Sequence, residues 1–280
     1  MTTLVISPHL DDAALSVGGT IASWTAAGER VVIASVYTKG PPLGEIAPSM
    51  RKFADYVTRR SEDAAACTVL GAEIRRLDHV ERAFRRPYLT GWSFFTTPAH
   101  REGFATLGAV RDSLEQLAQL EPTRILIPFG IGNHIDHVEA SLAAIDLAIA
   151  HDWLARVWFY EDFYALSRTM RRAHPVAERS TWSARRSPLL AAGRLAVVLR
   201  TIAAARRGPA LDALWPPALQ TASWRLHTVA IKDYEQQKLD AIARYPSQTK
   251  AFGGVTAISR ALRTYHAFWD SAEPFWHVGR

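Results

Sequence analysis

Residues 4–19 read LVISPHLDDAALSVGG, an apolar run that gives way to a proline, a histidine and two aspartates. The run at 4–6 is typical of a short buried strand that ends where proline removes a backbone donor. From Asp11 onward the apolar spacing is that of a helix with acidic side chains near its positive end. The chain is therefore expected to open with a strand that leads directly into a helix.

The same alternation of short apolar strands and longer helices continues to about residue 165. Strand-like runs occupy 31–38, 73–78, 124–129 and 157–162, and helix-like runs occupy 13–28, 56–71, 104–122 and 137–152. Such alternation is typical of a parallel sheet with helices on both faces. The sequence predicts an α/β, Rossmann-like three-layer fold with a mostly parallel sheet, plus a helical Arg-rich insertion.

We expect a single domain built from three parts. Residues 1–165 form the Rossmann-like core, and residues 166–226, which break the alternation, form the insertion or lid. Residues 227–280 contain a strand-like piece and an amphipathic helix, and are expected to rejoin the core.

The net charge of +6 and the pI near 9.7 come mainly from arginines that crowd between Arg168 and Arg207. Within that region, the stretch 188–207 is apolar with arginines at intervals. It suits a helix packed on its own protein, or alternatively a helix lying on an anionic membrane. The N-terminus lacks a signal-peptide pattern and no apolar run is long enough for a membrane span, so a cytoplasmic location is expected.

Cysteine chemistry is restricted to one residue, Cys67. A single cysteine allows no intramolecular disulfide and no zinc site built on several thiolates. Cys67 lies in an apolar helical pattern, where a buried structural thiol is expected. Any metal ion must therefore be held by histidines and carboxylates.

Two clusters of histidine and aspartate follow predicted strands. The segment 9–12, HLDD, comes after the first strand, and the segment 134–137, HIDH, comes shortly after the strand at 124–129. The carboxyl ends of parallel strands meet at one edge of the sheet, so the clusters can face each other. Two histidines and one carboxylate would leave a divalent metal an open position for water. The alternative is that these are turn residues whose aspartates cap the next helices.

These motifs resemble those of the zinc-dependent N-acetylglucosaminyl deacetylases of the PIG-L/LmbE type. The first family motif is matched by Pro8, His9, Asp11 and Asp12, and the second by His134 and His137. Two further similarities are less specific. Arg59, Glu62, Leu70 and Gly71 resemble residues of a family helix, and Lys238, Ser247 and Gln248 resemble a C-terminal family element.

The resemblance implies a metal-binding set with Zn²⁺ as the expected ion and another divalent metal as the alternative. The implied ligands are His9, Asp12 and His137. It further implies that Asp11 is the general base and that His134 stabilises the oxyanion. Asp136 either orients His134 or caps the following helix.

Substrate contacts are expected from Arg59, Glu81 and Trp92. Glu81 stands roughly where the family commonly has an aspartate that contacts substrate hydroxyls, and Arg59 is alternatively a solvated surface residue. Trp92 lies in an aromatic loop at 81–103. The aromatic side chains of this loop either stack on a sugar or acyl group or pack into the core.

The sequence therefore predicts an amide hydrolase that removes an acetyl or longer acyl group from the nitrogen of an amino sugar. The expected partner is a small-molecule amino sugar or glycoconjugate, such as a specialised metabolite. Two alternatives stay open: a metal-dependent phosphoester hydrolase, and a non-enzymatic nucleotide-binding α/β protein. Against the second, and against nucleic acid as a partner, the turn after the first strand has no phosphate-cradling glycine motif.

Overall fold

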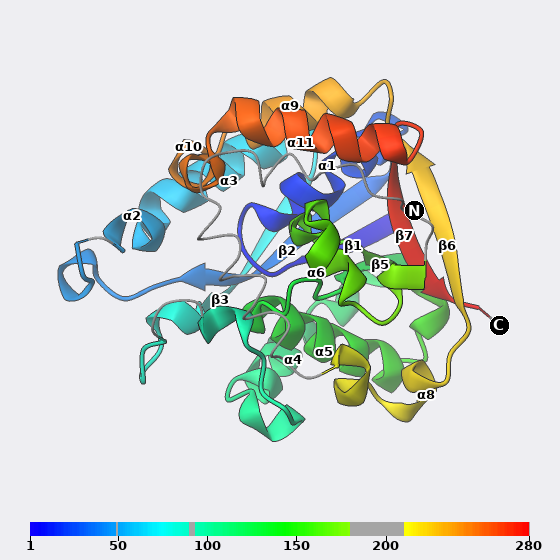
Figure 1. Cartoon of the computed structure of the whole chain (residues 1–280), viewed down its shortest axis with the longest axis horizontal. Coiled ribbons are helices and arrows are strands. Elements are labelled where there is room, and N and C mark those ends of the chain that lie inside the picture. The colour runs from blue at the N-terminus through cyan, green and yellow to red at the C-terminus, as the bar shows by residue number, and fades with distance from the viewer. Residues whose placement is uncertain (49, 90–92, 180–209, 280) are drawn as a thin grey trace.

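The computed structural model describes residues 1–48, 50–89, 93–179 and 210–279. Within these residues a seven-stranded sheet forms the centre of the molecule (Figure 1). In spatial order its strands are β3 (Glu73–Val80), β2 (Arg30–Lys39), β1 (Thr2–Ser7), β4 (Arg124–Pro128), β5 (Val157–Tyr160), β7 (Ala272–Val278) and β6 (Trp224–Ala230). The first five pair in parallel, and β7 pairs antiparallel with both β5 and β6.

Helices cover both faces of this sheet (Figure 1). One side carries α1 (Asp12–Ala26), α3 (Tyr56–Leu70), α9 (Glu235–Ile242) and α11 (Val255–Phe268). The other side carries α4 (Leu107–Glu115) and α5 (Ile135–Ala150). Shorter helices are α2 (Arg51–Ala54), α6 (Arg168–Arg172), α8 (Pro217–Gln220) and α10 (Pro246–Thr249). The predicted α/β, Rossmann-like fold with a mostly parallel sheet is confirmed.

Strand β1 shows why the opening run of the sequence is apolar without alternation. Leu4 and Ile6 belong to one hydrophobic cluster and Val5 to another, and all three side chains are fully buried. Successive side chains of a strand point to opposite faces, and here both faces are covered by helices. An uninterrupted apolar run is the consequence.

The C-terminal part adds two strands to the sheet. The strand-like piece corresponds to β6, and the amphipathic helix to α9. The last strand, β7, was not predicted, and it enters between β5 and β6 instead of extending the edge. Its placement depends on pairing with a strand more than a hundred residues earlier, which local periodicity does not report.

The centre of the predicted insertion, residues 180–209, lies outside the described residues, and with it the whole stretch 188–207. The flanks that the structure describes contain α6 and α8. The division into core, insertion and C-terminal part stays a prediction. Among the described residues, no helix is both long enough and apolar enough to cross a bilayer.

The chain changes direction across the sheet between β1 and β4. From β1 the chain builds outward through β2 to β3, whereas β4 and β5 lie on the opposite side of β1. Ligands of open α/β sheets bind at such a switch point, outside the carboxyl ends of the strands. Both histidine clusters follow the strands that flank this point.

Candidate functional site

The first cluster is shaped by a tight turn after β1. The Ser7 hydroxyl donates to the carbonyl oxygen of His9 (2.6 Å) and accepts from the backbone N–H of Ala13 (3.0 Å). The backbone N–H of His9 donates to Oδ2 of Asp12 (2.8 Å). These local bonds hold the Asp12 carboxylate against the His9 ring.

The second cluster follows a glycine-containing loop after β4. Gly130, Gly132 and Asn133 have φ angles of 78°, 93° and 56°. Positive φ angles suit glycine and asparagine, which explains the sequence GIGN before the histidines. His134 then caps the start of α5, which places His137 in the first turn of that helix.

One ring nitrogen from each of two histidines approaches a single carboxylate oxygen. Oδ2 of Asp12 lies 3.0 Å from Nδ1 of His9 and 3.2 Å from Nε2 of His137. One donor atom from each of these three buried residues lies within 4.8 Å of the others. Nε2 of His137 makes no hydrogen bond of good geometry despite its burial. Two nitrogens and one oxygen gathered in this way fit a divalent metal ion such as zinc.

Electrostatics within this cluster favour an anionic Asp12 beside a cation. Burial alone would raise the pKa of Asp12, but His137 and His9 hold it well below its usual range. Burial also lowers the pKa of His137, but the Asp12 and Asp162 carboxylates outweigh it and raise that pKa to about 9. The site therefore strongly attracts positive charge.

Asp11 lies beside the cluster but is not part of it. Its side chain is buried, and burial together with the Asp12 charge raises its pKa to about 6, although Arg59 and His9 oppose this rise. Its Oδ1 lies 4.0 Å from Nη2 of Arg59. The two adjacent aspartates thus have different surroundings, which is the condition for different roles.

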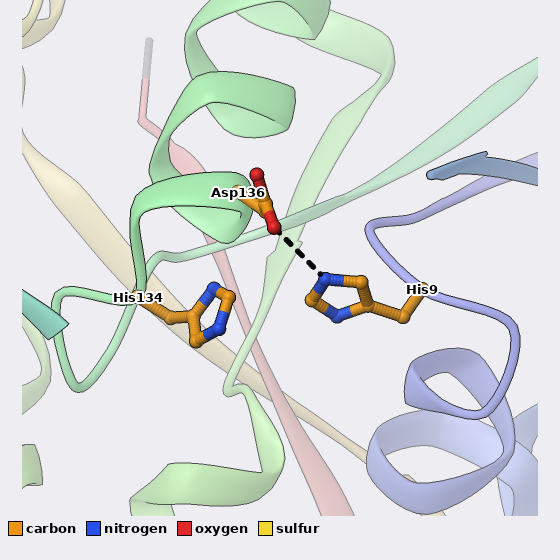
Figure 2. Close-up of side chains that lie close together, drawn as sticks. All are labelled: His9, His134 and Asp136. Carbon is orange, nitrogen blue, oxygen red and sulfur yellow. Dashed lines mark hydrogen bonds and ion pairs between the residues drawn. The ribbon is translucent and has the colours of Figure 1, made fainter. Parts of the chain in front are cut away.

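Asp136 contacts the first cluster from the start of α5. Its Oδ2 lies 3.2 Å from Nε2 of His9, and both of its oxygens accept from the backbone N–H of Arg82 (3.1 Å each). Figure 2 shows the bond between Asp136 and His9, with the His134 ring beside them. His9, His134 and Asp136 form a second group of candidate ligands, and it shares His9 with the first.

The His134 ring is packed between aromatic side chains. Phe95 meets it edge-on at 5.3 Å, and the Tyr164 ring lies nearly parallel to it at 6.2 Å. Burial and the two neighbouring histidines lower the pKa of His134 to about 3, so its ring is neutral. Phe95 therefore packs against a candidate catalytic residue, in line with the packing alternative for its loop.

The predicted substrate contacts have separate outcomes. Arg59 is 3% exposed, so the alternative of a solvated surface role is wrong. Its guanidinium pairs with Glu81 and donates to the carbonyl oxygen of Phe53 (2.9 Å). Arg59 and Glu81 are thus brought together beside Asp11, and Trp92 lies outside the described residues.

Asp162 is a site residue that sequence reasoning did not single out. It follows β5, and its Oδ1 lies 2.6 Å from Nδ1 of His137. The available signal was an acidic residue at the end of a predicted strand, the same signal that marked the two clusters. Cys67, by contrast, is the buried structural thiol that was expected.

Glu62 and Lys238, which belong to the less specific family similarities, make polar contacts between neighbouring elements of the fold. The Glu62 carboxylate accepts from the backbone N–H (2.9 Å) and the hydroxyl (2.5 Å) of Ser247, which ties α3 to α10. Lys238 pairs with Glu273 at 2.6 Å in the interior. The carboxylate of Glu273 also accepts from the backbone N–H groups of Gly19 and Thr20, just after a kink in α1 at Val17.

Comparison with solved structures gives the same fold. The A40926 pseudoaglycone deacetylase Dbv21 is 21% identical with a TM-score of 0.66, over 99% of this chain and 97% of that chain. A deacetylase from the teicoplanin biosynthesis pathway is 21% identical with a TM-score of 0.70, over 100% and 98% of the two chains. The N,N'-diacetylchitobiose deacetylase from Pyrococcus horikoshii is 15% identical with a TM-score of 0.55, over 99% and 83%.

Sequence comparison identifies the family. No curated protein matches the chain. The sequence model described as PIG-L: GlcNAc-PI de-N-acetylase matches residues 4–148, a segment that contains both histidine clusters and more than half of the 280 residues. The chain therefore belongs to the PIG-L (GlcNAc-PI de-N-acetylase) family.

Proposed function

We propose that this protein is a metal-dependent amide hydrolase that removes an acetyl or longer acyl group from the nitrogen of an amino sugar. The observation that carries the proposal is the buried group of His9, Asp12 and His137 at the switch point of the sheet, with Asp11 beside it. This arrangement places metal ligands and a separate carboxylate base side by side.

His9, Asp12 and His137 would hold the ion, with zinc the expected metal. A bound ion would act as a Lewis acid toward the acyl carbonyl and would make a water molecule more acidic. Asp11, which is not among these ligands, accepts the proton of the attacking water and returns it to the leaving amine. Its buried position excludes bulk water as a competing proton acceptor.

His134 supplies the donor for the oxyanion. Its ring is held by Phe95 and Tyr164, and in its neutral state the ring carries one N–H donor. A preorganised donor of this kind is worth about 3 kcal/mol in the transition state. Asp136 fixes the orientation of His9 through the bond to Nε2. A role of Asp136 in orienting His134 stays a prediction.

We propose a glycoconjugate as the substrate. The family model is described as a GlcNAc-PI de-N-acetylase. Two neighbours that align over nearly all of both chains are described as an A40926 pseudoaglycone deacetylase and a deacetylase of the teicoplanin biosynthesis pathway. The diacetylchitobiose deacetylase aligns over less of its own length and with a lower TM-score. A specialised metabolite that carries an N-acyl amino sugar fits this pattern. Arg59, Glu81 and Trp92 stay the predicted sugar contacts.

A phosphoester hydrolase is less well supported. Paired metal ions are common in such enzymes. The two ligand groups found among the described residues share His9, so they describe alternatives for one ion. We therefore retain amide hydrolysis as the proposed reaction.

The experiment is amine release from a panel of N-acyl amino sugars and their conjugates, with added zinc and with a chelator. We expect release from at least one conjugate, loss of release with the chelator, and recovery on addition of zinc. Release that is insensitive to chelation would contradict the metal-dependent reaction. Absence of both release and bound metal would return the two clusters to turn and capping roles.

A further inference from the structure

Asp162 links the second cluster to the end of β5. It is 1% exposed, its Oδ1 lies 2.6 Å from Nδ1 of His137, and its Oδ2 accepts from the backbone N–H of Ile131 (2.9 Å). Ile131 belongs to the glycine-containing loop that carries His134. One buried carboxylate thus touches both the His137 ring and the loop that leads to the next histidine.

This contact determines which nitrogen of His137 bears the hydrogen. An ionised carboxylate only accepts hydrogen bonds, so Nδ1 of His137 must be the donor in the 2.6 Å contact. In the neutral ring the lone pair then lies on Nε2. Nε2 faces Oδ2 of Asp12 at 3.2 Å and makes no hydrogen bond of good geometry. With Nδ1 engaged by Asp162, Nε2 is the ring nitrogen that can offer an electron pair to an ion on the Asp12 side of the site.

We propose that Asp162 is the positioning residue that sets the tautomer and orientation of His137, so that His137 offers Nε2 to the metal ion. The inference rests on the proposed function, because it assigns a role toward the same ion. Carboxylates that bind the outer nitrogen of a ligand histidine commonly contribute a factor of about 10–100 in metal affinity.

The change Asp162→Asn tests this with little change in shape. A carboxylate accepts from both His137 and Ile131, whereas an amide has one oxygen and one NH₂ group. If the amide oxygen accepts from Ile131, the NH₂ group faces Nδ1 of His137 and favours the tautomer with hydrogen on Nε2. That tautomer cannot ligate through Nε2 without losing its proton.

Zinc affinity of the full chain is measured by competition with a fluorescent chelator. We expect the dissociation constant for zinc to rise by about 10–100-fold in Asp162→Asn. In the zinc-loaded wild type, long-range ¹H–¹⁵N spectra should show zinc on Nε2 and hydrogen on Nδ1 of His137, with the ring assigned by its absence in His137→Gln. This second measurement remains decisive even where Asp162→Asn folds poorly.

Glu161→Gln is the matched control. Glu161 is also buried, but its carboxylate accepts from Arg171 (2.7 Å at each oxygen), Tyr265 (2.7 Å) and Trp276 (3.0 Å). This variant should lose stability and keep the zinc affinity of its folded fraction.

Four outcomes would overturn the inference. Equal zinc affinity in Asp162→Asn and the wild type would refute the role of Asp162 and leave the proposed function standing. Zinc bound to Nδ1 of His137 in the wild type would do the same. An equal loss of zinc affinity in Glu161→Gln would show that any change at the end of β5 weakens zinc binding, so the specific role of Asp162 would be refuted. A wild type that binds no zinc or other divalent ion refutes both the inference and the proposed function.

Discussion

The division of labour between the two adjacent aspartates is tested by Asp11→Asn. The substitution keeps the size of the side chain and removes its capacity to accept a proton. Asp11 contributes no atom to the group of His9, Asp12 and His137, so metal binding should survive. The expected phenotype is a protein that is loaded with metal and nearly inactive.

The size of the loss follows from the surroundings of Asp11. A positioned general base contributes about 10²–10⁴-fold to a reaction rate, or about 3–5 kcal/mol of barrier. The Asp11 side chain is 7% exposed, so solvent cannot readily replace the missing base. The guanidinium of Arg59, whose Nη2 lies 4.0 Å from Oδ1 of Asp11, is not a proton acceptor. We therefore expect the loss in kcat of Asp11→Asn to fall in the upper part of this range.

The assay compares Asp11→Asn with His137→Ala. Metal content is measured by atomic absorption, kcat by amine release, and folding by circular dichroism. We expect full metal content and a collapsed kcat for the first variant, and loss of metal for the second. Near-normal kcat in Asp11→Asn would refute Asp11 as the base, and loss of its metal would place Asp11 among the ligands.

Three further predictions concern the scaffold. The pKa of the buried His174 ring is lowered to about 3, because burial disfavours its charged form. The folded state therefore has its full stability above pH 6.5, the ordinary pKa of histidine, and loses stability as the pH falls below that value. Between about pH 7 and 5, the free energy of unfolding in urea should fall by about 2 kcal/mol more in the wild type than in His174→Gln. The same pH dependence of this free energy in both proteins would contradict a buried neutral ring. Lys238→Met leaves Glu273 buried without its ion-pair partner and should lower the free energy of unfolding by about 3–5 kcal/mol, whereas an unchanged denaturation midpoint would show that the pair contributes nothing. Gly19→Ala places a Cβ 2.8 Å from Cδ1 of Ile231, so thermal unfolding should report a loss of about 1–3 kcal/mol, and an unchanged Tm would mean that α1 has room to shift.

The sequence by itself determined the parallel core and the position of the site. Apolar runs without alternation require strands buried on both faces, and polar clusters directly after such strands must lie at the carboxyl edge of the sheet. The segments 9–12 and 134–137 could therefore be matched to each other before any coordinate was known. The chemistry proposed for them follows from the residue types, because a chain with one cysteine would have to hold a metal with histidines and carboxylates.

Only the tertiary structure decided the partners of these side chains. The bonds of Asp136 to His9 and of Asp162 to His137 depend on the relative heights of three neighbouring strand ends, which the register of the sheet sets. The insertion of β7 between β5 and β6 is likewise a pairing between distant segments. Local periodicity reports which face of an element is buried, but it contains no information on which distant side chain lies across that face. The alignment of the strands in the folded sheet determines which distant side chains meet.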